Sequence, residues 1–408
     1  MHEAWIIDGA RSPRGRGKPG GGLAHIHPQR CFAQILAGLQ KKVGFDPADI
    51  EDVVAGCSVG NGDHAHDIAR LAALDAGWPV SATGVTLHRY CGSGQQAVSF
   101  AAMAVMSGQQ QAVIGGGVEF MSHYISLSTQ GMHAGNAHLF AQYPLINQGL
   151  SADLIATIEG FSRGDCDAYA VESQRRAAIA KAEGRFEKSI IPVTNEDGST
   201  ALDHDEHARP GTTLESLAAL TPSFTELGAK GPKGAERSWD EIARARYGLD
   251  GPINHVHHGG NSSGIVDGAS AILIASPDYA KVHGLKPRAR IVQTAVAGDD
   301  PVIMLTAPAP SARKCLEKAG MAASDIDLWE VNEAFASVVL KFLREMEVDP
   351  ATVNPNGGAI ALGHPIGATG PMLIMTVLDE LERQNKSTAL VSMCTGGGMG
   401  TATIIERI

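Results

Sequence analysis

Three separated stretches of this chain indicate its fold and its chemistry. Residues 88–94 are HRYCGSG, residues 363–370 are GHPIGATG, and residues 394–400 are CTGGGMG. Each sets a cysteine or a histidine in a glycine-rich turn, so together they supply a nucleophile, a base and a second acid/base. We expect Cys91 to open a helix, where backbone N–H groups and the helix dipole would lower the pKa of its thiol below the free value of about 8.5. A nearby imidazole would complete its activation.

Length and composition limit the class of protein. With 408 residues, of which 44% are hydrophobic, the chain should hold two or three folding units. The N-terminus reads as a first strand and no uncharged run could span a bilayer, which predicts a cytoplasmic protein with no membrane partner. A net charge of −11 disfavours nucleic acid as a partner.

The cysteines and histidines outside these motifs have simpler interpretations. The six cysteines form no CxxC pair, which disfavours a disulfide framework or a zinc knuckle. HVHH at residues 255–258, with His255 and His257 on one face of an expected strand, and DHAHD at residues 63–67 could each hold a metal. Such clusters are more often hydrogen-bonded surface, so we predict no functional metal. We interpret four cysteines as structural: Cys31, Cys57, Cys166 and Cys315.

The alternation of segments divides the chain into three parts. Residues 1–118 alternate strand-like and helical runs, as a layered α/β unit does. Residues 119–258 carry more charge, glycine and proline, and are interpreted as an inserted loop domain. Residues 259–408 return to the alternation, so the second half repeats the architecture of the first. The expected strands are Ala4–Ile7, Asp52–Cys57, Ala112–Gly116, Ala271–Ala275, Leu328–Val331, Ala389–Met393 and Thr401–Ile405.

Helices are expected at three places. Gln95–Met106 is apolar nearly all round, which predicts a buried helix. Asp165–Ala182 is amphipathic. Ser238–Tyr247 carries Ser238 as a possible N-cap with Glu241 three residues on, whereas residues 226–234 are too rich in glycine for a regular element.

These motifs, with NEAF at residues 332–335 and NGG at residues 356–358, resemble the thiolase family along essentially the whole chain. A lone CGSG would be weak evidence, but four motifs follow one another in the family's order: residues 91–94, residues 332–335, the run 356–370 that contains His364, and residues 394–400. The resemblance implies a five-layered α/β/α/β/α fold built from two similar halves plus a loop domain. It also implies an acyltransferase with a ping-pong reaction on acyl-CoA and CoA, no separate cofactor, and a homodimer or homotetramer.

The chemistry assigns a task to each motif residue. Making or breaking a carbon–carbon bond beside a thioester needs an acyl carrier, a base for the α-carbon and donors for two oxyanions. Cys91 is the expected carrier, His364 takes its proton, and Cys394 exchanges the proton at the α-carbon. By resemblance, His364 and a water held on Asn332 meet the enolate oxygen, and the N–H groups of Cys91 and Gly396 meet the tetrahedral oxyanion. A simpler interpretation makes Cys91 a buried filler and Asn332 a helix cap.

The resemblance marks the CoA site less sharply. Arg209 would face the adenine and phosphate end with Ser216 nearby, Phe224 would flank the pantetheine, and Ser263 would bind its amide. Arg209 could equally be an ordinary surface charge. A basic cluster that could meet the phosphates consists of Lys230, Lys233 and Arg237.

Two departures from the family pattern bear on the substrate. Where many thiolases carry His-Met ahead of Gly-x-Thr-Ala-Glu, residues 147–153 read NQGLSAD, and residues 225–259 are longer than the corresponding family loop. This long segment would cover bound CoA or a bulky acyl chain, or form a surface elaboration or subunit contact. We expect thiolysis of 3-ketoacyl-CoA rather than dedicated acetoacetyl-CoA synthesis. Less favoured functions are those of a ketoacyl synthase and of a non-catalytic CoA- or lipid-binding protein.

Overall fold

The computed structural model describes residues 2–124, 132, 135–232 and 235–408, and within them one mixed sheet organises the chain. The strands of its first half are β1 (Trp5–Arg11), β2 (Gly15–Arg16), β3 (Asp52–Gly56), β4 (Thr83–Leu87), β5 (Ala112–Phe120) and β8 (Val266–Ala275). Those of the second half are β9 (Ala289–Gly298), β10 (Leu328–Val331), β11 (Thr388–Thr395) and β12 (Met399–Arg407). The order is β10-β11-β12-β9-β1-β8-β5-β3-β4, with β2 on β8. Because β1 and β9 share only two residue pairs, this seam divides the sheet into two halves.

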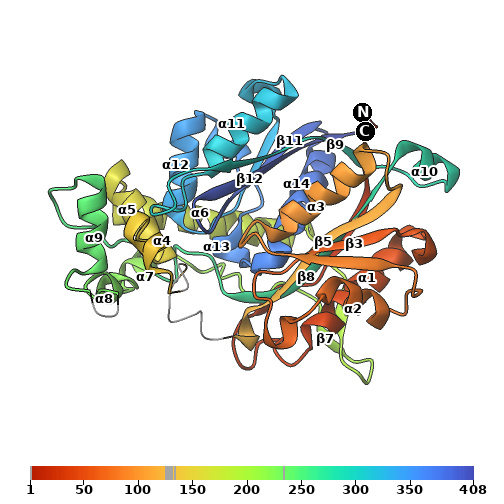
Figure 1. The fold of residues 1–408 in the computed structure, drawn as a ribbon, viewed down its shortest axis with the longest axis horizontal. Helices are drawn as coiled ribbons and strands as arrows, with labels where there is room; N and C mark the ends of the chain where they lie inside the picture. Colours follow the sequence, from red (N-terminus) through yellow and green to blue (C-terminus); the bar gives the residue numbers. More distant parts are fainter. Residues whose placement is uncertain (1, 125–131, 133–134, 233–234) are drawn as a thin grey trace.

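Helices form three layers around the two half-sheets (Figure 1). The outer face of the first half is covered by α1 (Pro28–Val43) and α2 (Ile68–Asp75), and that of the second by α11 (Pro308–Ala319) and α12 (Ala336–Met346). Between the halves lie α3 (Ser93–Met106) and α14 (Thr369–Gln384). In β8, Ile272 and Ile274 join the central core while Leu273 joins the outer one, as the period of two in a strand requires. The predicted five-layered fold is confirmed.

Residues after β5 form most of the remaining elements. They are α4 (Ala137–Gln142), α5 (Gln148–Glu159), α6 (Arg163–Ala182), the paired strands β6 (Val193–Thr194) and β7 (Thr200–Leu202), α7 (Leu214–Ala218), α8 (Thr225–Gly228) and α9 (Trp239–Tyr247). Figure 1 shows α4, α5, α7, α8 and α9 gathered at one end of the molecule. Two short helices complete the fold: α10 (Pro277–Val282) and α13 (Ala359–Leu362). No described helix is long and apolar enough to cross a membrane.

Several predicted boundaries differ from the structure. Strands β4 and β9 were not predicted, and β5 and β8 extend beyond the expected ranges because all their residues are buried between helices on both faces. β8 lies between β1 and β5, so the boundary predicted at residue 259 leaves one strand of the first half's sheet in the second part.

Local predictions in the loop region had mixed outcomes. The helix predicted over residues 238–247 is α9, and Ser238 and Glu241 form the predicted capping box. The prediction of no regular element after residue 226 was wrong at its start, where α8 forms a single turn; residues 233–234 lie outside the described part. The strand predicted at residues 255–257 was also wrong, because the N–H groups of Val256 and His257 donate to Asp153 instead of to a neighbouring strand.

Helix α3 is less completely buried than predicted. Most of its residues lie between the half-sheets, but the side chains of Phe100 and Met103 are 45% and 47% exposed. The central layer therefore leaves one apolar stripe of α3 at the surface.

A buried ion cluster ties the segment after β1 to residues 203–206. Asp205 accepts hydrogen bonds from both terminal nitrogens of Arg11, at 2.8 and 2.9 Å, and from the backbone N–H of Arg14 at 2.8 Å. All three residues are buried. Burial alone would raise the pKa of Asp205, but the charges of Arg11 and Arg14 outweigh it and hold the pKa at about 2.

Replacing Asp205 with asparagine is expected to destabilise the fold by about 3–5 kcal/mol, because two buried guanidinium groups lose their carboxylate. Since the folded pKa lies below the unfolded one, the contribution is present above pH about 4 and is lost as the pH falls toward 2. Urea unfolding followed by tryptophan fluorescence would measure the shift. The control Asp75→Asn breaks an exposed ion pair with Arg30 and should cost less than about 1 kcal/mol; equal losses would contradict the assignment.

Candidate active site

The turn around Cys91 leaves β4 and enters α3. Its geometry is held by Ser93, whose hydroxyl accepts from the Arg89 N–H at 2.8 Å and donates to the Tyr90 carbonyl at 2.6 Å. Tyr90 has a φ of 46°, an uncommon conformation for a residue with a side chain. The turn thus presents the thiol one residue ahead of the helix N-cap, Gly92.

The three glycine-rich turns pack directly against one another. A Cβ added to Gly92 would lie 2.4 Å from the Thr395 side chain, and one added to Gly94 would lie 2.3 Å from the carbonyl oxygen of Gly367. Only glycine allows such close approach of the backbones. The glycines therefore bring the turn of Cys91 against the turns that follow His364 and Cys394.

Asn332 and Cys394 are brought together by the sheet. β10 and β11 run parallel, Asn332 follows the last residue of β10, and its N–H donates to the Ser392 carbonyl at 3.0 Å. Cys394 lies two residues further along β11, before the turn into β12. Both side chains are fully buried, so they lie at the same edge of the second half-sheet.

His364 is held in one tautomer. Its Nδ1 lies 2.6 Å from the Thr369 hydroxyl, which itself donates to the Pro365 carbonyl, so Nδ1–H is the donor and Nε2 carries the lone pair. Burial, assisted by the charge of Arg14, lowers the pKa of His364 to about 3. Nε2 lies 3.5 Å from Nδ2 of Asn332, whose Oδ1 is buried with no hydrogen-bond partner. The ring is thus a neutral base beside a free amide oxygen.

The thiol of Cys91 does not have the low pKa expected from its place at a helix start. Burial raises the pKa of Cys91 to about 12, although the N–H groups of Cys91 itself and of Gly396 favour the thiolate. Removal from water outweighs the helix dipole. Cys394 is also held as a thiol, because burial and the nearness of Cys91 both raise its pKa. These effects place Cys91, Cys394 and the Gly396 amide in one cluster.

The residues expected to bind CoA are arranged around the NEAF stretch, with one exception. The Phe224 ring lies edge-on to Phe335 at 6.1 Å, and the Ser263 N–H donates to the Ala334 carbonyl at 2.9 Å. Ser216 is exposed, and its hydroxyl is used to cap α7.

Arg209 lies near His207, which packs against Gly264, the residue after Ser263. Its charge, after burial, contributes to lowering the pKa of His207 to about 4. His207 packs so closely on Gly264 that an added Cβ would lie 2.2 Å from its Nε2. The Arg209 side chain is exposed, as are Lys230 and Arg237, whereas Lys233 lies outside the described residues.

The histidines of the possible metal sites serve as hydrogen-bonding groups. His255 bridges Asp153 and Asp240 at 2.8 and 3.0 Å, and His257 Nδ1 lies 2.7 Å from Asp153. His64 accepts from the Phe120 N–H at 2.9 Å. In the part of the chain that the structure describes, no group of three or more His, Cys, Asp or Glu side chains is arranged so that it could hold a metal ion.

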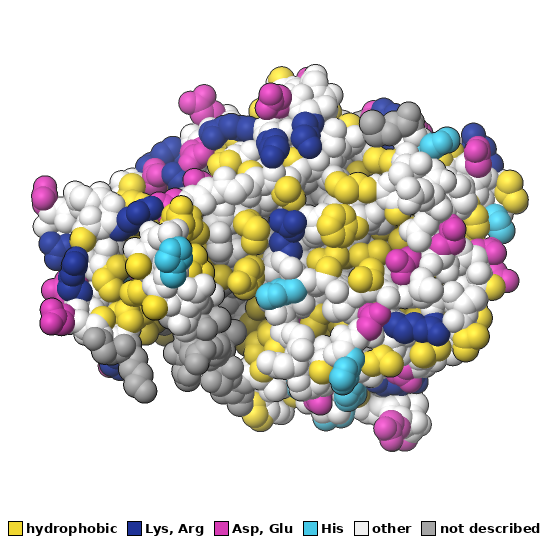
Figure 2. Space-filling view, in the orientation of Figure 1, with side chains coloured by type: hydrophobic (Ala, Val, Ile, Leu, Met, Phe, Trp, Pro, Cys, Tyr) yellow, Lys and Arg dark blue, Asp and Glu magenta, His cyan; other side chains and the backbone are white. Residues whose placement is uncertain are grey.

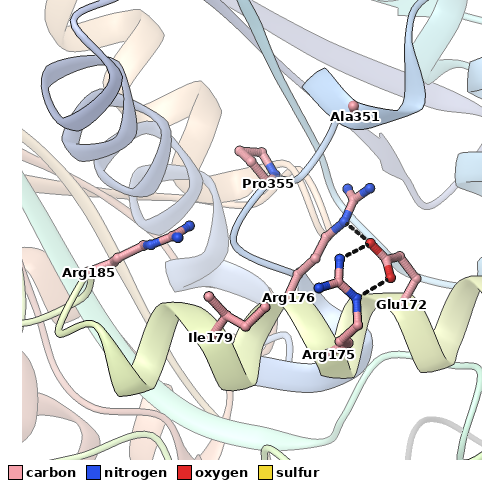
Figure 3. A pocket seen from close by; sticks show the side chains of 7 residues that line it. All are labelled: Glu172, Arg175, Arg176, Ile179, Arg185, Ala351 and Pro355. Carbon is pink, nitrogen blue, oxygen red and sulfur yellow. Dashed lines mark hydrogen bonds and ion pairs between the residues drawn. The ribbon is translucent and has the colours of Figure 1, made fainter.

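A surface cavity of about 370 Å³ lies beside α6 (Figure 3), and its lining includes none of the proposed catalytic residues. Glu172 pairs with Arg175 and Arg176, and Arg185 donates to Glu183 and Asn356. Because its guanidinium groups already have partners, this cavity offers no free charge for a ligand.

Two buried charged residues near the motifs were not predicted from the sequence. Glu119 belongs to β5 and accepts several backbone hydrogen bonds, and Arg14 lies close enough to His364 to lower its pKa. The sequence did contain a signal for Glu119, because this charged residue interrupts the apolar run AVIGGGVEF. A charge within a fully buried strand must have dedicated partners.

Comparison with known proteins gives one consistent result. The chain matches the thiolase N-terminal domain over residues 4–231 and the thiolase C-terminal domain over residues 285–407. It is 41% identical to a steroid 3-ketoacyl-CoA thiolase of Mycobacterium tuberculosis, covering 100% of this chain and 95% of that protein. It is 39% identical to a 3-oxoadipyl-CoA/3-oxo-5,6-dehydrosuberyl-CoA thiolase of Escherichia coli, covering 100% of both. A solved acetyl-CoA acetyltransferase from Bacillus anthracis superposes with a TM-score of 0.85 at 34% identity, covering 100% of this chain and 99% of that one.

Proposed function

Since this chain belongs to the thiolase family and is an acyltransferase of that class, we propose that it cleaves 3-ketoacyl-CoA with CoA, or runs the reverse Claisen condensation, through an acyl group on Cys91. The observation that carries the proposal is the packing of the Cys91, His364 and Cys394 turns at one glycine junction. Acetyl-CoA and acyl-CoA serve as substrates, and no separate cofactor is required.

The first half-reaction uses the neutral His364. Its Nε2 takes the thiol proton as the Cys91 sulfur attacks the substrate carbonyl. Because burial disfavours the thiolate, the thiol of Cys91 loses its proton only as His364 accepts it. The N–H groups of Cys91 and Gly396 stabilise the oxyanion. Collapse of the tetrahedral adduct leaves acyl-Cys91, and in thiolysis it releases the enolate of acetyl-CoA.

The second acid/base acts at carbon. In thiolysis, Cys394 gives its proton to the α-carbon of the departing enolate; in condensation, it removes that proton from acetyl-CoA. His364, once its Nε2 carries the thiol proton, donates to the enolate oxygen together with a water hydrogen-bonded to Oδ1 of Asn332. The buried Oδ1, which has no other hydrogen-bond partner, supports the role of this water. The CoA thiol then gives its proton to the Cys394 thiolate while its sulfur takes the acyl group from Cys91, and protonated His364 returns its proton to the Cys91 sulfur.

The degradative direction is the preferred interpretation, and dedicated acetoacetyl-CoA synthesis is the second candidate. The Mycobacterium and Escherichia relatives are named as thiolases, and the Bacillus structure as an acetyltransferase. A thiolysis panel of linear, branched, dicarboxylic and steroid-derived 3-ketoacyl-CoAs separates them: activity only with acetoacetyl-CoA favours the second candidate. Absence of acyl transfer with every member would favour a non-catalytic lipid-binding relative. The second cysteine, Cys394, disfavours a ketoacyl synthase.

The long segment after Phe224 contributes to the wall of the acyl site. Trp239 and Tyr247 of α9 pack on the same apolar core as Phe335 and Cys394. The Tyr247 hydroxyl accepts from the Ile303 N–H at 2.9 Å. This shared core supports the proposal that α9 covers a bulky acyl chain.

Replacing Trp239 with alanine is expected to raise KM for long or bulky 3-ketoacyl-CoAs by about 10-fold, the effect of losing about 1.4 kcal/mol of apolar contact. Replacing residues 228–250 by a short Gly/Ser linker should have a larger effect. Steady-state thiolysis measures KM, and alkylation of Cys91 should stay unchanged. Trp5→Ala, at the seam end of the sheet, is the control. Unchanged KM for every chain length, together with dissociation of the oligomer, would show that the segment is a subunit contact.

A homodimer or homotetramer is supported by the surface of the central layer. Hydrophobic side chains gather near the middle of the face on which Figure 1 shows α3 (Figure 2), and Phe100 and Met103 are exposed on that helix. β4 ends the sheet order and offers an unpaired strand edge. A cytoplasmic location remains a prediction; the six cysteines are all free thiols.

A further inference from the structure

Glu119 is a buried acid at the junction of the catalytic turns. Its carboxylate accepts the Ser58 N–H at 2.8 Å and the Val59 N–H at 3.2 Å, both just beyond β3. It also accepts the Gly367 N–H at 3.0 Å, in the loop that carries His364. The Cys57 thiol, 3.9 Å away, is a fourth donor. One side chain therefore joins two loops that are distant in sequence.

The backbone around Glu119 is packed as tightly as glycine permits. A Cβ on Gly117 would lie 2.0 Å from the Gly367 carbonyl oxygen, and one on Gly56 would lie 2.3 Å from the Gly94 nitrogen. The end of β3, the strand β5, the start of α3 and the His364 loop thus meet with no side chains between them. A small shift of the Gly367 contact would be transmitted directly to the first turn of α3, and so to Cys91.

The hydrogen bonds decide the ionisation state of Glu119. Burial raises its pKa to about 7, but its backbone contacts all favour the charged form. All four groups around the carboxylate are donors, and a protonated acid would need an acceptor for its own O–H. The four donors therefore favour the carboxylate form of Glu119.

We propose that Glu119 is a positioning residue: its carboxylate holds the His364 loop against the end of β3 and thereby sets the imidazole relative to Cys91. The inference rests on the proposed roles of Cys91 and His364. Glu119 has an electrostatic effect as well, because its charge adds to burial in disfavouring the Cys91 thiolate. The other ionisable groups in this cluster are Cys57, Tyr124, Cys394 and Asp267.

The test uses the full-length Glu119→Gln variant at pH 8. An amide places N–H groups against backbone N–H donors, so the contacts with residues 58–59 or with Gly367 must break. Acetylation of Cys91 by acetyl-CoA, followed by mass spectrometry, is expected to slow by about 100-fold, the scale of a displacement of about 1 Å. Alkylation of Cys91 by iodoacetamide should shift to lower pH, because the neighbouring negative charge is gone. A purely structural role would slow acetylation without shifting the alkylation profile.

Two further variants complete the test. Glu119→Asp keeps the charge but is one carbon too short to reach both loops, so acetylation should slow while the alkylation profile stays as in the wild type. Asp379→Asn removes a buried carboxylate that pairs with Arg288 far from these turns, and it should leave both measurements unchanged. Wild-type acetylation in Glu119→Asp or in Glu119→Gln overturns the positioning role, and an unshifted alkylation profile in Glu119→Gln overturns the electrostatic effect. If Glu119→Gln does not fold, the acetylation rate of Glu119→Asp alone tests the positioning role. Failure of the wild type itself to acetylate Cys91 would instead overturn the proposed function.

Discussion

Replacing Cys91 with serine is expected to abolish acyl transfer, with a loss of about 10⁴- to 10⁶-fold, the range seen when a covalent nucleophile is removed. Serine is a much weaker nucleophile beside a neutral imidazole in a buried site, since its hydroxyl has a far higher pKa than a thiol. Wild-type protein incubated with acetyl-CoA alone should gain one acetyl group, and peptide mapping should place it on Cys91.

The matched control is Cys315→Ser, which changes a buried thiol in α11 that donates to the Gln293 carbonyl at 3.5 Å. Because burial raises the pKa of both thiols to about 12, ionisation alone does not distinguish them. What distinguishes Cys91 is its proposed base and its oxyanion donors. An acetyl group mapped to another cysteine, or full activity in Cys91→Ser, would remove Cys91 from the mechanism.

Replacing Cys394 with alanine is expected to separate the two half-reactions. The variant should still acetylate Cys91, because carriage of the acyl group does not require the second thiol. Thiolysis and condensation should fall by about 10²–10⁴-fold, the contribution of a positioned acid/base. Single-turnover acetylation and steady-state thiolysis, measured on the same preparation, would show this split.

Glu119 offers a comparison for this result, since its variants are expected to slow acetylation itself. If Cys394→Ala retained thiolysis, the proton at the α-carbon would be handled elsewhere, and His364 would be the first group to examine. If Cys394→Ala also failed to acetylate, its side chain would be needed for the packing of the Cys91 turn, which the close contact of Gly92 with Thr395 would explain.

Much of the fold could be predicted because the deciding signals are local. The capping box at Ser238 and Glu241 depends on residues three apart, and α9 starts where it indicates. Within the buried strands β5 and β8, the expected segments Ala112–Gly116 and Ala271–Ala275 are continuous runs without a polar side chain. The pairing of β8 with β5 and β1 was not predictable in the same way, since it depends on which strands meet after more than 140 residues of intervening chain.

The candidate active site shows the same division between what local sequence predicts and what depends on distant segments. Cys91, His364 and Cys394 could be named from glycine-rich motifs, because such turns leave a recognisable pattern along the chain, and Asn332 could be named from the NEAF motif. The pKa of Cys91 was predicted in the wrong direction, since the sequence shows the helix start but not the depth of burial. The use of His255 and His257 as partners of Asp153 also could not be read from spacing.

The sequence by itself determined the chemical groups, the order of the motifs and the layered α/β class, because these depend on residue type and on short periodic patterns. Only the tertiary structure decided that Glu119 joins the loops of Ser58 and Gly367, that His364 is neutral with Nε2 facing Nδ2 of Asn332, and that the cysteines are protonated. Burial and hydrogen bonding between distant segments set these properties. Each of these properties depends on many neighbouring groups, and those groups come from segments that lie far apart in the sequence.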